Sequence, residues 1–318
     1  MPRYHLVVGA GGIGRETAAA LVRRGHDVVL GSRRGADPGI PGVTAVALDA
    51  TDADALAAAA AGGAVSIVNA TNPASYVHWD RDWPPLATAF LVAAERSGAG
   101  LLTVSNLYGY GRVAGPMTES TPLSPNGIKG RVRTRVWEQA YAAHVAGRVR
   151  ATELRASDYI GAAAAPGVSY LGQYVIAPAG RGRTAWIPMG NPDVPHSVTH
   201  LPDIGELAAV LATDRSWGRA WHVPTAAPPT IRELAAQAAA LGGHPAPAVR
   251  RYPSGVMRLA RVMPLIRALD ETRHQFEGPF VLDSTLAQTT FGLRPTPWRD
   301  AVAATLGRPP GIPSVDPA

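Results

Sequence analysis

The feature that most constrains this chain is a cluster of glycines near its N-terminus, Gly-Ala-Gly-Gly-Ile-Gly at positions 9–14. It follows a short apolar run at 4–8, typical of a buried strand, and opens a segment at 14–24 with helical spacing of Ala and Leu. Glycines at such a turn permit a tight bend and the close approach of a pyrophosphate, which the unpaired N–H groups of the helix start attract. The pattern predicts a dinucleotide-binding site, with Gly12 lying against the pyrophosphate. Its expected contacts are Gly9, Gly11, Gly12, Ile13 and Gly14.

Strand and helix signals alternate over the next 140 or so residues. Apolar runs predict strands at 28–31, 43–48, 65–69 and 101–105 and a sixth beginning at 152, and helical spacing predicts helices at 53–61, 85–97 and 134–146. Repeated strand–helix units imply an α/β fold, a Rossmann-type doubly wound parallel sheet with helices on both faces.

The pattern becomes looser after residue 156. Further helices are expected at 203–213, with Asp203 as N-cap, and at 230–241, where Thr230 and Glu233 form a capping box. We therefore expect three parts. They are a dinucleotide-binding core at 1–156, a mixed region at 157–307 that returns to the core and forms a smaller C-terminal substrate-binding region, and a loose tail at 308–318.

The end of the second strand selects between NAD and NADP. NAD sites usually carry an Asp or Glu there, which binds the ribose hydroxyls. This chain has Ser32, Arg33 and Arg34 instead, so the acid is absent and two guanidinium groups are available for a 2′-phosphate. We expect NADP as the cofactor; the alternative is that both arginines only face solvent.

The composition excludes several classes of protein. With 46% of its 318 residues hydrophobic, the chain can bury a sizeable core. It has no Cys, which excludes disulfides, thiolate nucleophiles and Cys-based zinc sites. The longest apolar stretch, 56–68, is too short for a bilayer, and glycines interrupt the N-terminal run where a signal peptide would continue. We expect a cytoplasmic protein without a membrane partner, as a monomer or a homodimer.

The net charge of +6 requires nucleic acid to be considered as a partner. The arginines are scattered, however, and the sequence has neither a zinc-finger pattern nor a basic tail, so a polyanionic cofactor explains the charge and no nucleic-acid partner is expected. Of the 30 Lys and Arg residues only Lys129 is a lysine. This singles it out, because a buried lysine can lose its proton and an arginine cannot.

Seven short motifs follow one another along nearly the whole chain. They are VGAGGIG at 8–14, LD at 48–49, NAT at 69–71, VSNLYGYG at 104–111, LRASDYIG at 154–161, FVLD at 280–283 and FGLRP at 291–295. Their order and spacing resemble the extended short-chain dehydrogenase/reductase family, also called the NAD-dependent epimerase/dehydratase family.

The resemblance implies roles for particular residues. Asp49 would meet the adenine, while Ala70 and Thr71 would line the cofactor beside the adenosine ribose or the diphosphate. The loop after Ser157 would approach the nicotinamide. A small-molecule substrate would bind to separated segments, roughly 157–200 and 222–282.

The chain departs from this family at its catalytic motif, Tyr-x-x-x-Lys, which occurs nowhere in the sequence. Aligning Glu138 with the family's glutamate puts Gly130 at the tyrosine position and Thr134 at the lysine position. The serine position falls on Ser105 or Asn106. Atypical members of the family share this loss, and some of them are reductases with a relocated acid while others bind cofactor without chemistry.

Few residues are candidates for a relocated acid. Lys129 lies one residue before the vacated tyrosine position. Tyr108 follows the fifth strand, where ligands of such sheets bind, and Tyr159 and Asp158 follow the sixth. A tyrosine beside a lysine can be tuned as a general acid. Tyr110 matches a structural tyrosine of the family and is not proposed as the acid.

Two other patterns are expected to be structural. His196 and His200 have the spacing of metal ligands on a helix, but Pro195 argues against a helix and a third ligand is not apparent, so no metal is expected. Arg131, Arg133 and Arg135 are expected at a solvated helix start, from which one could reach a cofactor phosphate.

Taken together, these patterns predict an NADP(H)-binding oxidoreductase of the epimerase/dehydratase type that acts on a small organic carbonyl or alcohol. Two alternatives stay open. One is an epimerase or dehydratase that retains its cofactor, and the other is a regulatory protein that senses NADP without catalysing a reaction.

Overall fold

The computed structural model describes residues 3–164, 169–214 and 216–309. Its centre is a seven-stranded sheet with the order β10-β6-β5-β4-β1-β2-β3, in which every pairing is parallel. The strands are β1 (Tyr4–Val8), β2 (Asp27–Ser32), β3 (Val43–Ala47), β4 (Ala64–Asn69), β5 (Gly100–Asn106), β6 (Ala151–Ala156) and β10 (Ala220–His222). The strand order reverses between β1 and β4, which is the Rossmann topology that the sequence predicts.

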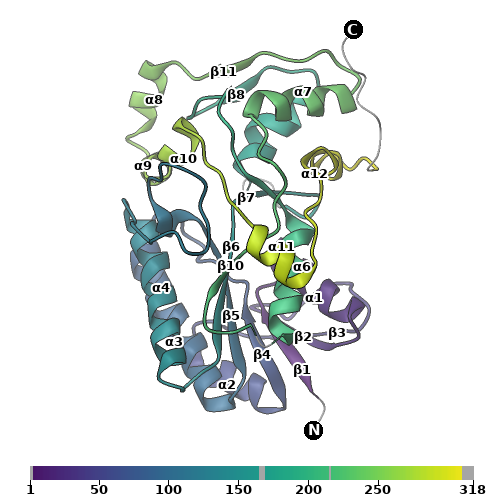
Figure 1. The fold of residues 1–318 in the computed structure, drawn as a ribbon, viewed down its shortest axis with the longest axis vertical. Helices are drawn as coiled ribbons and strands as arrows, with labels where there is room; N and C mark the ends of the chain where they lie inside the picture. Colours follow the sequence, from purple (N-terminus) through teal and green to yellow (C-terminus); the bar gives the residue numbers. More distant parts are fainter. Residues whose placement is uncertain (1–2, 165–168, 215, 310–318) are drawn as a thin grey trace.

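Helices cover both faces of this sheet (Figure 1). One apolar core lies between the sheet and α2 (Ala53–Ala61), α3 (Trp79–Ser97) and α4 (Ile128–Val145). A second lies between the sheet and α1 (Gly12–Arg23) and α6 (Leu201–Thr213). The doubly wound α/β prediction is confirmed.

Helices α3 and α4 each begin six residues earlier than the sequence predicts. Helix α3 begins at Trp79 rather than 85. The sequence pattern does not indicate its first turns because Pro84 and Pro85 lie inside the helix, where proline is disfavoured. Helix α4 begins at Ile128 rather than 134. In both cases the extra turns carry side chains of the candidate site.

The chain beyond β6 builds a smaller lobe above the carboxyl ends of the strands (Figure 1). It contains the parallel pairs β7 (Asp158–Ile160) with β9 (Val198–His200) and β8 (Ala185–Ile187) with β11 (Val249–Arg251). A third core packs between these strands, α7 (Ile231–Leu241) and α12 (Trp298–Thr305). The remaining elements are η1 (Tyr108–Tyr110), η2 (Gly172–Ile176), α5 (Ala177–Ala179), α8 (Ser254–Ala260), α9 (Pro264–Asp270), α10 (His274–Glu277) and α11 (Thr285–Phe291).

The two capping predictions have opposite outcomes. Thr230 and Glu233 form the expected capping box at α7. Asp203 is not the N-cap of α6, because the helix begins at Leu201 and the Asp203 carboxylate instead accepts hydrogen bonds from the backbone and side chain of Thr296. The tail expected at 308–318 lies outside the described residues from position 310 onward.

Within the described part of the chain, no helix has both the length and the apolar character needed to span a bilayer.

A buried histidine makes the stability of this fold depend on pH. In β10, the Nδ1–H of His222 donates to the Asp283 carbonyl at 2.7 Å, and its Nε2 lies 2.6 Å from the Tyr110 hydroxyl. Burial lowers the pKa of His222 to about 4, compared with about 6.5 in an unfolded chain. Between these values the unfolded chain binds a proton that the folded chain does not.

We therefore expect this residue to lower the free energy of unfolding by about 1–2 kcal/mol between pH 7 and pH 5, with little effect above pH 7 and a constant effect below pH 4. Urea denaturation of the wild type and His222→Gln at both pH values measures this. An equal loss in the two proteins would contradict the assignment.

Candidate active site

The glycine turn between β1 and α1 has the geometry of an anion site. Helix α1 begins after Gly11 without a side-chain cap, and its first turn carries no acid. The first N–H groups of a helix have no partner within the helix and carry a partial positive charge. A Cβ placed on Gly11 would meet no described atom within 4 Å. Gly11 therefore offers an open face for a pyrophosphate beside the helix start.

The other glycines of the turn face the protein itself. Gly9 has a φ of +112°, and a Cβ there would lie 2.6 Å from the Ala70 carbonyl oxygen. A Cβ on Gly14 would strike the Gly9 carbonyl. A Cβ on Gly12 would lie 2.6 Å from the Ala163 oxygen, so a side chain at this position would meet protein backbone rather than a pyrophosphate. The loop that follows β7 covers this position.

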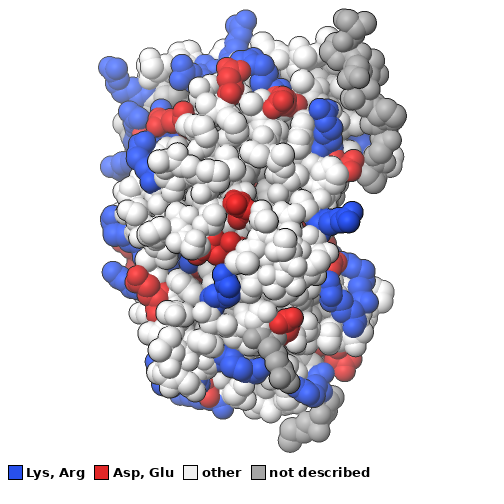
Figure 2. Space-filling model, in the orientation of Figure 1, with Lys and Arg blue, Asp and Glu red and all other residues white. Residues whose placement is uncertain are grey.

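The residues expected to bind the cofactor lie at the ends of adjacent strands. Ser32 is the last residue of β2 and Arg33 and Arg34 follow it, and both arginines are exposed. Figure 2 shows basic side chains gathered over the purple N-terminal segments of Figure 1. Asp49 follows β3; hydrogen bonds from the Thr51 backbone and hydroxyl, with a smaller effect from Arg33, lower the pKa of this carboxyl.

Ala70 and Thr71 follow β4 and lie directly beside the glycine turn. The Ala70 N–H donates to the Val8 carbonyl at 2.9 Å, which ties the ends of β4 and β1 together. The Asn69 side-chain oxygen accepts from the Thr71 hydroxyl at 2.6 Å. The glycine turn, the arginines, Asp49 and this segment thus all lie along the carboxyl edge of β4-β1-β2-β3.

Lys129 and Tyr108 belong to a network of four side chains near the carboxyl end of β5 and the start of α4. The Lys129 ammonium lies 3.0 Å from a Glu271 carboxylate oxygen and 4.6 Å from the centre of the Tyr76 ring. The Tyr76 hydroxyl donates to the Tyr108 hydroxyl at 3.0 Å. We call Tyr76, Tyr108, Lys129 and Glu271 the Lys129 network. Only about 5% of the Lys129 side chain is exposed, so its charge acts inside the protein rather than in solvent.

The environment keeps both tyrosines protonated. Burial raises the pKa of Tyr76 to about 12. Burial also raises the pKa of Tyr108 well above its ordinary value, with further contributions from Tyr76 and the Asp158 carboxylate. A protonated Tyr108 can donate a hydrogen bond or a proton to a ligand.

The structure explains why a tyrosine is missing at position 130. A Cβ on Gly130 would lie 2.5 Å from the Tyr108 carbonyl oxygen and 2.9 Å from the Pro125 side chain. The start of α4 therefore packs against η1 too closely for a side chain at position 130, where the backbone of Tyr108 occupies the space.

We expect Gly130→Ala to destabilise the protein by about 1–3 kcal/mol, although alanine favours helices, because backbone must move to admit the methyl group. Gly115→Ala is the control, since a Cβ there meets no described atom within 4 Å. Thermal and urea unfolding measure both variants. A Gly130→Ala protein as stable as the wild type would show that the contact between α4 and η1 is looser than described.

Arg133 is buried, so its expected place at a solvated helix start is wrong. Its guanidinium carbon lies 4.1 Å from the centre of the Trp83 ring and 5.0 Å from that of Trp79. It donates to the Val104 carbonyl at 3.3 Å and to the Asn72 side chain at 3.4 Å, and burial lowers its pKa to about 10. Arg133 thus links α4 to the ends of β4 and β5. Arg131 and Arg135 are exposed as expected.

Tyr159 lies apart from the Lys129 network. It packs on the core beneath α1 and α6, and burial raises its pKa. The two histidines considered as metal ligands lie at either end of a short extended segment that includes β9, and the described residues contain no cluster that could hold a metal ion. His196 instead contacts Asp158 at 2.8 Å.

Sequence patterns missed several members of this site. Glu271 stands 142 positions from Lys129, so no local spacing could indicate their ion pair. Tyr76 precedes α3 in a segment without a recognisable motif. The burial of Arg133 follows from the tryptophans of the neighbouring helix, and the pairing of Asp158 with His196 follows from the alignment of β7 with β9.

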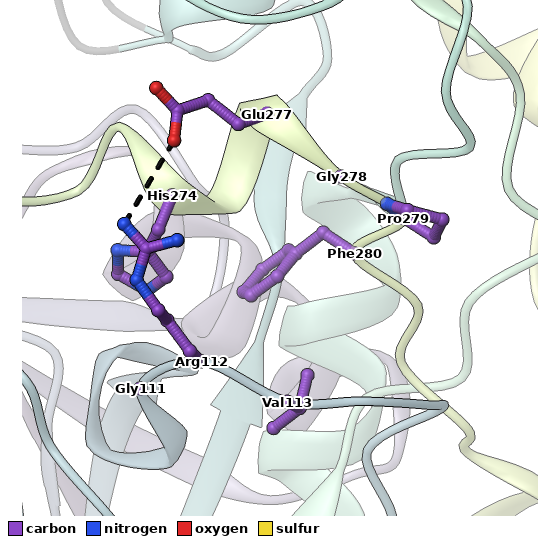
Figure 3. Close-up of a pocket in the computed structure, with 8 residues that line it drawn as sticks. All are labelled: Gly111, Arg112, Val113, His274, Glu277, Gly278, Pro279 and Phe280. Atoms are coloured by element: carbon purple, nitrogen blue, oxygen red, sulfur yellow. Dashed lines mark ion pairs between the residues drawn. The ribbon is translucent and has the colours of Figure 1, made fainter.

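A surface pocket of about 270 Å³ lies near this site but outside it (Figure 3). The segment after η1 and the segment from α10 to Phe280 form its walls, and none of its lining residues comes from the glycine turn. Arg112 and Glu277 face each other across it at 3.9 Å, beside His274 (Figure 3). The Phe280 ring separates this pocket from His196, on which it stacks.

Comparison with known proteins identifies the fold. Residues 9–157 match the family model described as NAD(P)H-binding. This chain has the fold of the NAD-dependent epimerases and dehydratases. The fold that this resemblance implies is thereby confirmed. No curated protein matches the sequence.

Three solved structures illustrate the likeness. A dTDP-glucose 4,6-dehydratase from Bacillus anthracis in complex with NAD has a TM-score of 0.76 at 15% identity, covering 96% of each chain. The DesIV dTDP-glucose 4,6-dehydratase from Streptomyces venezuelae, with NAD and TYD bound, gives 0.74 at 21% identity with the same coverage. A UDP-glucose 4-epimerase from Thermus thermophilus in complex with NAD gives 0.73 at 17%, covering 96% of this chain and 98% of the other.

Proposed function

We propose that this protein is an NADP(H)-dependent oxidoreductase that reduces a small organic carbonyl compound or oxidises the corresponding alcohol. The observation that carries the proposal is the protonated Tyr76–Tyr108 pair at the end of β5. Two strands away, the open face of Gly11 lies beside the uncapped start of α1. A proton donor and a dinucleotide cradle on one sheet edge are what carbonyl reduction requires.

The residues of the cradle fit a dinucleotide. Gly11 and the first N–H groups of α1 would bind the pyrophosphate, Asp49 the adenine side, and Ala70 and Thr71 the adjoining ribose or diphosphate. When bound, the nicotinamide supplies or accepts a hydride. Tyr108 would give a proton to the carbonyl oxygen as it gains negative charge, and Lys129 would hold Tyr76 and Tyr108 in place through its contact with the Tyr76 ring.

Neighbouring structures bind NAD, whereas we propose NADP for this chain, because Ser32, Arg33 and Arg34 replace the acid that binds ribose hydroxyls in NAD sites. We expect NADPH to bind at least about ten times more tightly than NADH, or about 1.4 kcal/mol. Arg33→Ala should remove most of this difference. Titration calorimetry measures both affinities, and equal affinities in the wild type would refute the preference.

Turnover separates this proposal from its alternatives. NADPH oxidation is followed with simple aldehydes and ketones, and NADP+ reduction with UDP-glucose and dTDP-glucose. Net change in the nicotinamide absorbance supports an oxidoreductase. Sugar-nucleotide conversion without such a change would indicate an epimerase or dehydratase that retains its cofactor, and cofactor binding without either reaction would indicate a regulator.

A further inference from the structure

Asp158 and His196 form a partly buried pair at the junction of the core and the smaller lobe. Asp158 begins β7 immediately after the end of β6, and β7 pairs with β9 so that Asp158 lies opposite Val198. This alignment places the Asp158 Oδ2 atom 2.8 Å from His196 Nε2. The His196 side chain is about 1% exposed and that of Asp158 25%, so the carboxylate is the member that a ligand can reach.

The imidazole of His196 is held in one orientation. Its ring stacks on Phe276, with centroids 4.4 Å apart and planes 8° apart, and on Phe280 at 5.4 Å. Its Nδ1 lies 3.1 Å from the Gln275 carbonyl oxygen. A carbonyl oxygen only accepts, so Nδ1 must carry a hydrogen.

Both ring nitrogens therefore face oxygen acceptors. With Nδ1–H directed at Gln275, a neutral ring would turn the lone pair of Nε2 toward an ionised carboxylate, and the two would repel. One further proton between Nε2 and Oδ2 removes the repulsion, either on the imidazole or on the carboxyl group. With this geometry the pair binds one proton more than a neutral histidine beside an ionised carboxylate would.

The surroundings offer Asp158 no other compensating charge among the described residues. Four tyrosines lie close enough for the carboxylate to raise their pKa values, which burial has already raised, so all are uncharged at neutral pH; they are Tyr76, Tyr108, Tyr159 and Tyr170. Lys129 is paired with Glu271 and Arg273 with Asp270, and Arg133 is stacked on Trp83 behind Tyr108. This leaves His196 as the partner of the carboxylate.

We infer that the Asp158–His196 pair stores one proton and is a second acid–base group of the active site, which returns a proton to Tyr108 through Asp158. The inference rests on the proposed function. In the reducing direction, the hydride and its two electrons from NADPH form the new C–H bond, and Tyr108 gives the one proton that the carbonyl oxygen takes up to form the O–H bond. The Asp158–His196 pair then returns a proton to Tyr108. The pair is left one proton short and regains it from water; oxidation runs the same steps in reverse.

The protonation state is tested on the whole protein by ¹⁵N NMR of labelled histidine at pH 7. We expect His196 to show two protonated ring nitrogens in the wild type. In Asp158→Asn, where an amide can donate to Nε2, we expect a neutral ring. Asp193→Asn is the control, since Asp193 pairs with Arg232 on the surface of the same segment. A neutral His196 together with an ionised Asp158, the latter read from the ¹³C shift of its carboxyl group, would overturn the inference, and these measurements need no variant.

Kinetics test the role in catalysis, with 4-nitrobenzaldehyde and NADPH as the probe. Asp158→Asn should lower kcat by about 10²–10⁴-fold and remove the alkaline fall of the rate, while NADPH affinity and Asp193→Asn activity stay as in the wild type. An unchanged kcat in Asp158→Asn overturns the inference, as does a wild type that binds NADPH but does not reduce the aldehyde. A wild type that binds no NADPH overturns the proposed function itself, whatever the NMR result for His196.

Discussion

Gly11→Val is expected to weaken NADP(H) binding by at least about 100-fold while leaving the fold and its unfolding temperature unchanged. The backbone at Gly11, with φ −74° and ψ −178°, is extended and open to any residue, and a side chain there meets no described atom. The valine methyl groups would instead occupy the space in which the pyrophosphate must approach the α1 N–H groups. Calorimetric titration with NADPH and thermal unfolding measure the two effects.

The neighbouring glycines provide the contrast. Gly14→Ala places a methyl group against the Gly9 carbonyl, and Gly12→Val places methyl groups against the Ala163 oxygen and the Leu201 side chain. Both substitutions should lower the free energy of unfolding, so a loss of cofactor binding in these variants would not report on the pyrophosphate site. Wild-type affinity in a folded Gly11→Val protein would show that the glycine turn is not the cofactor site.

The fold could be predicted because each of its signals is local. The strands at 4–8 and 64–69 follow from short continuous apolar runs, and the helix at 53–61 from an alanine-rich run of nine residues. The strand–glycine–helix order then fixes a parallel sheet and its switch point. Interiors of elements were predicted better than their starts, since Pro84 and the arginines at the start of α4 obscure the helical spacing there.

The site could be predicted only where its residues share a motif. The glycine turn, Ser32 to Arg34 and the segment at 69–71 each lie at a strand end that the pattern reveals. Lys129 was singled out by its rarity, but its partners Glu271 and Tyr76 meet it through tertiary packing of segments far apart in sequence. The sequence also could not predict which glycines of the turn face protein and which face open space. The loop that covers Gly12 follows β7, about 150 residues later in the chain.

Tyr108→Phe is expected to lower kcat for carbonyl reduction by about 10²–10⁴-fold with little change in NADPH affinity. The hydroxyl of Tyr108 accepts from Tyr76 and keeps its own hydrogen for a ligand, and burial holds it protonated across neutral pH. Phenylalanine keeps the ring and its packing against Trp79, whose ring centroid lies 6.0 Å away, so the fold should be retained. Tyr76→Phe should cost less, because it removes only the donor to Tyr108. Steady-state kinetics and calorimetry on both variants check this.

A second question is whether the charge of Lys129 contributes to proton donation by Tyr108. Lys129→Met should also lower kcat, but it leaves the Glu271 carboxylate without its cation, so part of the effect could come from a displaced α4. Lys129→Met combined with Glu271→Gln keeps the charge balanced and serves as the control. If this double variant stays inactive while folding as the wild type does, the ammonium acts on the tyrosine pair. If it recovers full activity, Lys129 only balances Glu271, and Tyr108 donates its proton without help from the lysine.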